Sequence, residues 1–506
     1  MITPSQKDFI KLTKKGNLIP IYKEILRDLE TPVSAYLKFA NNAPYSFLLE
    51  SVEGEEKIAR FSFLAKNPEL IFQSKEKRAE LITFTNNGVA STKNMVIADS
   101  PLPFIRRIMA QHQFVNVEGL PRFCGGLVGY MGYDIVRFFE KLPQKPKDDL
   151  KLQDMILVLA KNLIIFDHMN HKIKVVSSVS VGAKATLKEK TQAYQNAVKT
   201  IESMIRELEK PLTITSSPNE KSLPEFTPKQ IVSNFSETQF KNIVNKAKKY
   251  IQAGDIIQVV LSQRLQTDLT TAPFNIYRAL RSLNPSPYMF YLNFSGTHLI
   301  GSSPELLVRC ENGIVETRPI AGTRPRGKDS KQDALLMKNL LRDPKERAEH
   351  TMLVDLGRND LGRVCQRGSV KLSEFMAIEK YSHVMHIVSN VKGILRKDKD
   401  VFDVLEAALP AGTVSGAPKI RAMEIIDTLE NISRGPYAGC VGYFSFSGNL
   451  DTCITIRTIV AANNKAYVQA GAGIVADSNP KKEFTETLNK AKAQIMAIEQ
   501  AQKQTH

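Results

Sequence analysis

Predicted strands and predicted helices occur in separate groups along this chain, and that grouping constrains its fold most strongly. After residue 235, runs typical of strands lie at 256–265, 288–294, 314–319, 438–446, 453–462 and 466–471. Runs with helical spacing lie at 331–356, 400–409, 417–430 and 481–502. A regular alternation of strand and helix would indicate a parallel sheet, whereas this grouping favours the α+β class.

The part of the chain before residue 235 has a different composition. Its first 170 residues alternate strand-like runs with turns, and the predicted strands lie at 33–39, 45–51, 156–166 and 173–179. A stretch rich in Lys, Glu and Ala at 183–209 predicts a helix, and the Pro- and Ser-rich stretch at 211–224 predicts an exposed linker. We therefore divide the chain into an N-terminal region (15–170), a helical segment with linker (171–234) and a C-terminal region (235–495).

The charge and the apolar runs limit the classes of partner. The net charge is +17, which permits binding to nucleic acid, to a membrane surface or to anionic metabolites. The basic residues are interspersed with acidic ones, without a basic-aromatic nucleic-acid motif. No run reaches the ~18 apolar residues of a membrane span, and the N-terminus lacks a signal-peptide pattern. The five scattered cysteines are typical of free thiols. We expect a cytoplasmic protein that binds neither nucleic acid nor membrane.

Two pairs of glutamates with the same spacing open two of the predicted helices. Glu346 and Glu349 follow an Asp-Pro dipeptide, and Glu483 and Glu486 follow an Asn-Pro dipeptide. The i, i+3 spacing turns both carboxylates of a pair to one side of its helix. One such pair is also explained by the helix dipole, which favours acidic residues in the first turn. Four carboxylates together suit a hard cation such as Mg²⁺.

Glycines, a histidine and an arginine surround these pairs in the sequence. Gly471-Ala472-Gly473 ends a predicted strand, and Gly322-Thr323 follows another, so both segments can offer backbone N–H groups to an anion. His386 lies in a strand-like run; near carboxylates its pKa would rise, and it could act as a general acid. Arg457 in an apolar run requires a carboxylate partner, either a structural aspartate or a ligand. Each feature alone also has a structural explanation; together they suggest metal-assisted chemistry on a small carboxylate. Serine-hydrolase, zincin and P-loop motifs are absent from the sequence.

With these residues in view, the chain resembles the large subunits (component I) of anthranilate synthases, within the chorismate-utilising family. The likeness covers nearly the whole chain. The longest matching segments are 254–264, 301–306, 317–323, 349–360, 409–419 and 471–473. The resemblance implies an α+β sandwich of large antiparallel sheets with flanking helices.

The resemblance also implies an active site for chorismate. Glu349 and Glu486 would bind Mg²⁺ directly, and Glu346 and Glu483 would support it in catalysis. His386 would be the general acid that helps the 4-hydroxyl leave as ammonia adds at C2. The product aminodeoxyisochorismate would then lose pyruvate to give anthranilate, the first committed step of tryptophan biosynthesis. The implied substrate-binding residues are Gly322, Thr323, Thr413, Tyr437, Arg457, Gly471, Ala472, Gly473 and Lys490.

Two positions distinguish relatives within the family. Aminodeoxychorismate synthases carry a nucleophilic lysine where this chain has Ala321. Isochorismate and salicylate synthases carry a basic lysine where this chain has Gln258. Both differences favour ammonia as nucleophile and anthranilate as product. The alternatives are a sibling amino-transferring synthase, a nucleic-acid-binding protein, and a tryptophan-sensing subunit without activity.

The resemblance further implies regulation and a partner. L-tryptophan would act as a feedback inhibitor at Glu50, Ser51, Pro287, Tyr288, Met289, Val441 and Tyr443. No glutaminase motif follows the family-like region, so we expect a separate glutamine amidotransferase subunit (component II) to supply ammonia, in a heterotetramer. Free ammonium should also serve.

Overall fold

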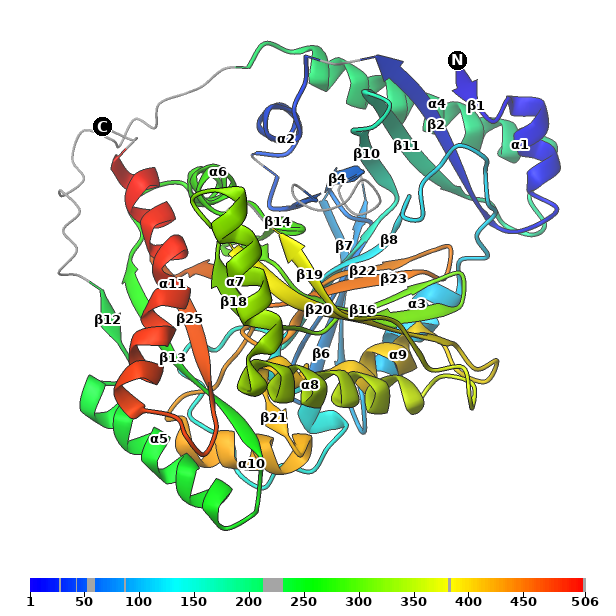
Figure 1. Cartoon of the computed structure of the whole chain (residues 1–506). Coiled ribbons are helices and arrows are strands. Elements are labelled where there is room, and N and C mark those ends of the chain that lie inside the picture. Colours follow the sequence, from blue (N-terminus) through cyan, green and yellow to red (C-terminus); the bar gives the residue numbers. More distant parts are fainter. Residues whose placement is uncertain are drawn as a thin grey trace.

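Two large antiparallel β-sheets form the framework of the computed structural model, and helices flank them (Figure 1). The structure describes residues 1–26, 29–41, 43–51, 60–85, 88–212, 231–380 and 384–503. Within these residues one sheet has 13 strands and the other has 12. The predicted α+β class is confirmed.

The 13-stranded sheet combines strands from both ends of the chain. Leu49 of β3 lies opposite Phe290 of β14, which joins the N-terminal and C-terminal parts. In spatial order its strands are β1 (Ile2–Thr3), β2 (Leu18–Leu26), β11 (Lys172–Ser180), β10 (Asn162–Asp167), β4 (Phe61–Lys66), β3 (Tyr45–Glu50), β14 (Tyr288–Phe294), β15 (Thr297–Ser303), β24 (Thr458–Ala462), β25 (Lys465–Ile474), β13 (Gln258–Asp268) and β12 (Val232–Ser233), with β21 (Gly416–Ala417) paired to β13.

The 12-stranded sheet is also shared, because Val441 of β22 lies opposite Tyr130 of β8. In spatial order its strands are β18 (Ile320–Pro325), β20 (Val384–Ile394), β17 (Ile314–Thr317), β16 (Leu306–Glu311), β23 (Leu450–Ile454), β22 (Cys440–Ser445), β8 (Gly126–Met131), β9 (Met155–Ala160), β5 (Leu70–Lys75), β6 (Arg78–Thr85) and β7 (Gly88–Val96), with β19 (Lys371–Lys380) paired to β20. The three-part division of the chain stays a prediction. Both sheets contain strands from the N-terminal and from the C-terminal region.

Several helices begin at residues whose side chains cap them. Ser236 and Gln239 form a capping box at the start of α5. The predicted helix at 331–356 is two helices, because Asp343 ends α7 and caps α8. The helices are α1 (Gln6–Leu12), α2 (Pro32–Phe39), α3 (Leu102–Ala110), α4 (Leu187–Glu209), α5 (Glu237–Gln252), α6 (Pro273–Leu283), α7 (Ser330–Arg342), α8 (Pro344–Gly362), α9 (Val401–Ala408), α10 (Lys419–Leu429) and α11 (Pro480–Lys503), with 3₁₀ turns η1 (Tyr133–Phe138) and η4 (Gly412–Val414). No helix in the described ranges is long and apolar enough to cross a membrane.

Three predicted strands differ from the structure. The run at 33–39 is helix α2, because Thr31 and Ser34 form a capping box and Pro32 starts the first turn. The run at 156–166 is two strands, β9 and β10, which lie in different sheets. The run at 453–462 is broken between β23 and β24 at Arg457, whose φ of +51° does not continue a strand.

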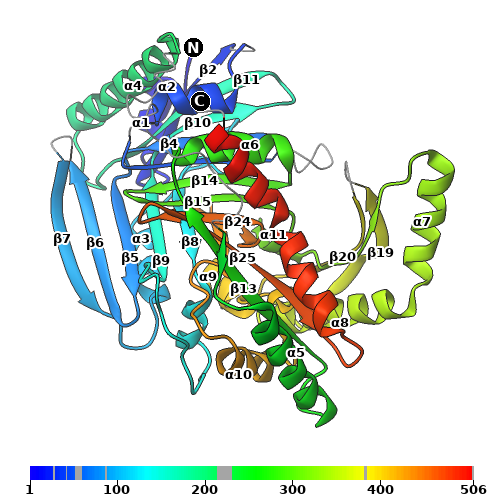
Figure 2. The ribbon, with the colours of Figure 1, turned by 90° about the vertical axis from the view of Figure 1, so that its left-hand side faces the viewer.

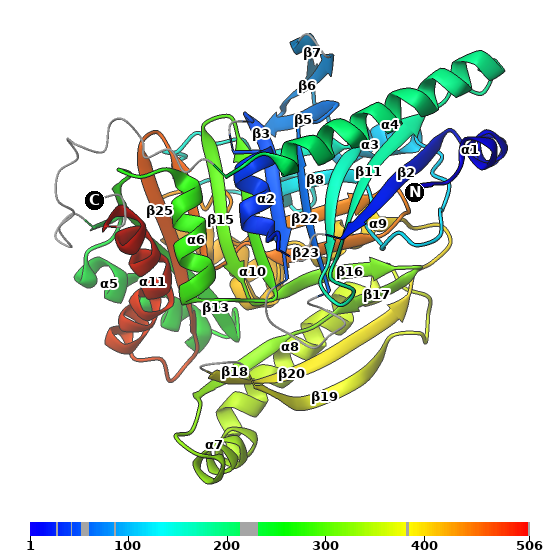
Figure 3. The ribbon, with the colours of Figure 1, turned by 90° about the horizontal axis from the view of Figure 1, so that it is seen from above.

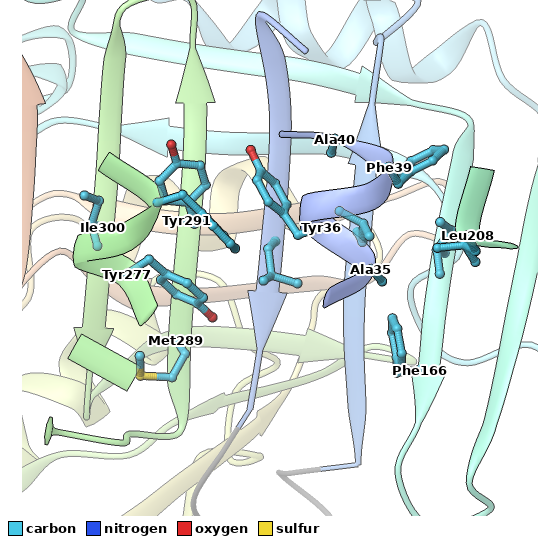
Figure 4. Close-up of a cluster of buried hydrophobic side chains, with 14 of the residues drawn as sticks. Ala35, Tyr36, Phe39, Ala40, Phe166, Leu208, Tyr277, Met289, Tyr291 and Ile300 are labelled. Carbon is cyan, nitrogen blue, oxygen red and sulfur yellow. The ribbon is translucent and has the colours of Figure 1, made fainter. Parts of the chain in front are cut away.

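An aromatic cluster packs α2 of the N-terminal region onto β14 and α6 (Figure 4). The ring of Tyr36 stacks on Phe274 with 4.3 Å between centroids and meets Tyr291 edge-on at 5.3 Å. The buried Tyr36 hydroxyl is satisfied by Ser46 at 2.7 Å. Burying one such side chain stabilises the fold by roughly 1.5–3 kcal/mol. This core therefore fixes the N-terminal region against the strands and helices that carry the candidate site.

Candidate active site

The two glutamate pairs lie near the starts of α8 and α11: Glu346 and Glu483 are in the first turns, and Glu349 and Glu486 follow one turn later. Asp343 accepts hydrogen bonds from the backbone N–H groups of Lys345 and Glu346, and Asn479 does the same for residues 481 and 482. Helix α8 packs on β18 and β20, whereas α11 packs on β25 (Figures 2 and 3). These strands therefore set where the carboxylates lie.

The N-terminal parts of α8 and α11 face a common space, because the same two lysines affect glutamates on both helices. Lys345 and Lys490 each lower the pKa of Glu349 on one helix and of Glu483 on the other. Lys490 also pairs with Glu486 at 2.8 Å and donates to the Gly471 carbonyl at 3.1 Å. The fold thus brings together glutamates that are more than 130 residues apart in the chain.

Negative charge is crowded in this space. Burial raises the pKa of Glu349, the hydrogen bond from Gln258 (3.0 Å) acts in the opposite direction, and neighbouring Glu346 raises the pKa further. Burial likewise raises the pKa of Glu483, with Ser478 acting against it and Glu486 adding to it. Burial is therefore the main cause that disfavours the charged forms of Glu349 and Glu483, and a neighbouring carboxylate adds to it.

The donor chemistry fits Mg²⁺, although the side chains are not arranged as a coordination sphere. Among the residues that the structure describes, no three His, Cys, Asp or Glu side chains are grouped closely enough to bind a metal. Glu346 pairs with Arg324 at 2.9 Å, and Glu486 pairs with Lys490. A hard divalent cation prefers carboxylate oxygens and would relieve the like-charge crowding. The metal site stays a prediction.

The Gly471-Ala472-Gly473 segment lies inside β25 beside these glutamates, one residue before the strand ends. A Cβ atom on Gly471 would lie 2.7 Å from the Tyr437 hydroxyl, and one on Gly473 would lie 2.4 Å from Gln258 Nε2. On one edge these residues pair with β13; on the other, β24 pairs with β25 only as far as Val468. Among the described strands that second edge is unpaired at 471–473, so its backbone can approach a ligand.

His386 lies in β20 opposite Thr323 of β18. Its Nδ1 atom is 3.0 Å from the Thr323 hydroxyl and 3.2 Å from the Gly322 carbonyl oxygen. A carbonyl only accepts, so the hydrogen bond to Gly322 requires the proton on Nδ1. A Cβ atom on Gly322, whose φ is +66°, would lie 3.0 Å from Glu346 Oε2. Gly322 therefore links the His386 strand to the first glutamate pair.

The predicted rise in the pKa of His386 is wrong. Burial lowers this pKa, the contact with Gly322 acts in the opposite direction, and the charge of Arg457 lowers it further. Among the described residues, the charge that shifts this pKa is the cation of Arg457 rather than a carboxylate. Before ligand binds, His386 is neutral at pH 7.

Arg457 lies in the break between β23 and β24 and is half-buried. Burial lowers its pKa, while Tyr437 and Glu486 act in the opposite direction. Its guanidinium has no carboxylate within ion-pair distance in the described part of the chain, so no structural aspartate there is its partner. Burial raises the pKa of Tyr437 to about 12, which keeps its hydroxyl a neutral donor beside Gly471. Arg457 and Tyr437 together can receive a ligand carboxylate.

Glu305 is a candidate that the sequence analysis missed. It follows β15 and is buried, and burial raises its pKa to about 8, with Thr413 and Lys490 acting in the opposite direction. Thr413 lies in the 3₁₀ turn η4, close to β25. The signals in the sequence were its position between Pro304 and Leu306 and its place in the matching segment 301–306. A carboxyl group that is protonated at neutral pH can donate a proton.

A cavity of about 830 Å³ lies between the two sheets, and all seven residues predicted to bind tryptophan line it. The carboxylate of Glu50 accepts hydrogen bonds from Tyr277 and from Arg281 (3.1 and 3.2 Å). Ser51 carries a buried hydroxyl without a partner among the described residues. The cavity also contains an ion cluster that the sequence did not indicate, because Asp451 accepts from Arg122, Arg309 and Tyr288, each at 3.0 Å.

Comparison with known proteins gives a consistent result over nearly the whole chain. The family model described as chorismate binding enzyme matches residues 47–496. Anthranilate synthase component 1 of Acetivibrio thermocellus is 49% identical over 505 residues, which are 99% of both chains. The same-named protein of Aquifex aeolicus is 49% identical over 498 residues, 98% of each.

Solved structures agree with these sequence relatives. Anthranilate synthase component I from Streptococcus pneumoniae aligns with a TM-score of 0.74 at 38% identity, over 93% of this chain and 98% of that one. The menaquinone-specific isochorismate synthase MenF of Escherichia coli aligns with a TM-score of 0.68 at 20% identity, over 98% and 99%, and shows the shared fold. The chain therefore belongs to the family of chorismate binding enzymes.

Proposed function

We propose that this chain is component 1 of an anthranilate synthase, converting chorismate and ammonia to anthranilate and pyruvate. The observation that carries the proposal is the guanidinium of Arg457, which has no carboxylate partner among the described residues and whose pKa is lowered by burial and raised by the nearby charge of Glu486 on α11. Chorismate carries two carboxylates. A site that has a guanidinium at one end and carboxylates suited to a metal at the other matches such a dianion.

Each end of the substrate has its own set of groups. Arg457 and Tyr437 bind the enolpyruvyl carboxylate through charge-assisted hydrogen bonds. The backbone of residues 471–473 and Lys490 bind the ring carboxylate. Glu349 and Glu486 would hold Mg²⁺, which supplies positive charge to that carboxylate when it is bound. Glu486 must then release Lys490, its present partner at 2.8 Å.

Loss of the 4-hydroxyl requires a proton, and two side chains can provide it. His386 is neutral in the free protein because burial lowers its pKa. A dianion beside the imidazole would raise that pKa, so His386 becomes an acid in the complex. Glu305 already holds a proton at neutral pH, since its pKa is about 8. We assign the donor role to His386 and treat Glu305 as a second donor.

The side chains of Ala321 and Gln258, which would lie near the chorismate ring, favour ammonia as the nucleophile and aminodeoxyisochorismate as the intermediate. Ala321 has no nucleophilic atom, and the Gln258 amide donates to Glu349 at 3.0 Å and cannot act as a base for water. Neither residue supports covalent attack or hydration. A separate glutamine amidotransferase subunit would supply the ammonia, in a heterotetramer with this chain. We also propose that the protein is cytoplasmic.

L-tryptophan is proposed as an inhibitor that binds in the 830 Å³ cavity. The cavity is walled by apolar side chains of β14 and β22, which suit an indole ring. It also contacts residues of β20, the strand that carries His386. A ligand that favours one arrangement of that strand would couple the two sites.

Product identification tests the function. The purified chain is incubated with chorismate, ammonium and Mg²⁺, and the products are separated and identified by mass spectrometry. Anthranilate with one equivalent of pyruvate supports the proposal. An aminated product that retains the enolpyruvyl group identifies a sibling synthase instead, and unchanged chorismate rejects the site.

A further inference from the structure

Arg434 and Glu430 form a fully buried ion pair that the mechanism above does not use. Their side chains are 1% and 2% exposed. Nε of Arg434 donates to Glu430 Oε2 at 2.9 Å, and Nη2 donates to Oε1 at 2.7 Å. Removing two charges from water is costly, and such pairs often contribute little net stability. The position of the pair therefore calls for a reason other than stability.

The remaining donors of Arg434 bind backbone carbonyls next to candidate site residues. Nη1 donates to the Val414 carbonyl at 2.7 Å, directly after Thr413 in the turn η4. Nη2 also donates to the Val260 carbonyl at 2.8 Å, two residues after Gln258 in β13. One guanidinium thus joins a turn and a strand that both carry groups of the site.

The same guanidinium lies over the rings of Tyr437 and Tyr133. Its central carbon lies 5.5 Å from that ring's centroid and 4.8 Å from the ring of Tyr133. A cavity of about 20 Å³ is lined by both Tyr437 and Arg434. A ring beside a void can tilt unless another contact holds it. Arg434 provides such a contact, and the Tyr437 hydroxyl then stays beside Gly471.

We propose that Arg434 is a positioning residue for substrate binding. It holds Tyr437, the Thr413 turn and β13 in one arrangement, so that the groups that bind the substrate carboxylates are in place before the substrate arrives. Glu430 neutralises it and is itself held by the Ser262 N–H (2.8 Å) and hydroxyl (2.9 Å). The inference rests on the proposed function, because it acts on the residues assigned there to chorismate.

The first test replaces both charges so that neither is left buried alone. In E430Q/R434Q, we expect the KM for chorismate to rise about 10-fold or more, with a smaller change in kcat, because an unfixed Tyr437 weakens binding. The matched control is D134N/R137Q/D427N, which removes a second ion cluster beside α10, in which Arg137 lies 2.7 Å from Asp134 and 2.8 Å from Asp427. The control should keep KM within about twofold at a similar melting temperature. Should the double variant not fold, R434K retains the charge and loses the planar guanidinium, and its KM should rise several-fold.

A double-mutant cycle then separates positioning from general destabilisation. Combined with Y437F, the substitution at Arg434 should raise KM much less than it does alone, since the group it positions is already impaired. Independent effects, or an unchanged KM in E430Q/R434Q and R434K, overturn the inference. Failure of the proposed function looks different, because the unsubstituted chain would then make no anthranilate.

Discussion

The candidate active site and the 830 Å³ cavity differ in how their charges are paired. In the active site Arg457 has no carboxylate partner in the described structure, and Glu349 and Glu483 are crowded by like charges. In the cavity Glu50 is neutralised by Arg281, and Asp451 by Arg122 and Arg309. Unpaired charge suits a ligand that carries net charge, such as a dianion with a metal. Paired charge around apolar walls suits a ligand without net charge, such as an amino acid with an indole ring.

The largest loss of activity is expected when a carboxylate of the proposed Mg²⁺ site is removed. We expect E349Q to lower kcat/KM by about 10³-fold or more, because the amide removes a charge that the cation needs. Activity is measured with saturating Mg²⁺ and ammonium. The matched control is D355N on the same helix. Asp355 forms an exposed ion pair with Arg358 at 2.9 Å, so its loss should leave the activity unchanged. Normal turnover in E349Q would remove the metal site from the account.

Loss of the proton donor should have the next largest effect. We expect H386A to slow the amination step by about 10²-fold while the affinity for chorismate changes little. Single-turnover kinetics measure the step, and calorimetry measures binding. Ser389 lies on the same strand and binds His350 at 2.6 Å, so S389A reports damage to the strand itself. An unchanged rate in H386A, with E305Q inactive, would transfer the acid role to Glu305.

A substitution in the cavity should leave catalysis intact. We expect S51F to raise the tryptophan concentration for half-inhibition by at least about 10-fold with kcat within about twofold, because the larger side chain fills space where the ligand would lie. Inhibition curves at fixed chorismate measure the change. S46A, a buried serine outside the cavity that binds the Tyr36 hydroxyl, is the control. Full sensitivity in S51F would place the inhibitor elsewhere.

A smaller effect is expected on stability in acid. Burial lowers the pKa of His112, His298 and His350 to about 4, from an ordinary value of 6.5. Below pH 6.5 the unfolded chain binds protons that the folded chain does not, so stability is full above about pH 6.5 and falls as the pH drops towards 4. Urea midpoints between pH 7.5 and 4.5 measure this change. H350Q should reduce the slope, and a flat profile in the parent chain would contradict the burial argument.

Local signals in the sequence predicted the ends of helices better than they predicted strands. The Asp-Pro dipeptide before Glu346 marked the start of α8, although the helix predicted at 331–356 ran through Asp343. The alternating pattern at 33–39 obscured the cap at Thr31, and α2 was predicted as a strand. The break at Arg457 depends on a left-handed backbone that no residue type there indicates.

The candidate site was predicted in part from residue patterns and in larger part from family resemblance. The spacing of the glutamates showed that each pair shares a helix face. That the two helices lie close together depends on the order of the strands in the sheets, which the spacing does not give. The pKa of His386 was predicted in the wrong direction, because its charged neighbour Arg457 lies 71 positions away in the chain. Glu305 and Arg434 were missed for the same reason, since their partners are set by tertiary contacts.

Continuous recording of anthranilate fluorescence tests the central claim most directly. The purified chain receives chorismate, Mg²⁺ and ammonium, and tryptophan is titrated in parallel reactions. The account predicts fluorescence that grows with time, disappears with a chelator and falls as tryptophan is added. Chorismate that persists without any fluorescence, at every tryptophan concentration including zero, would contradict it.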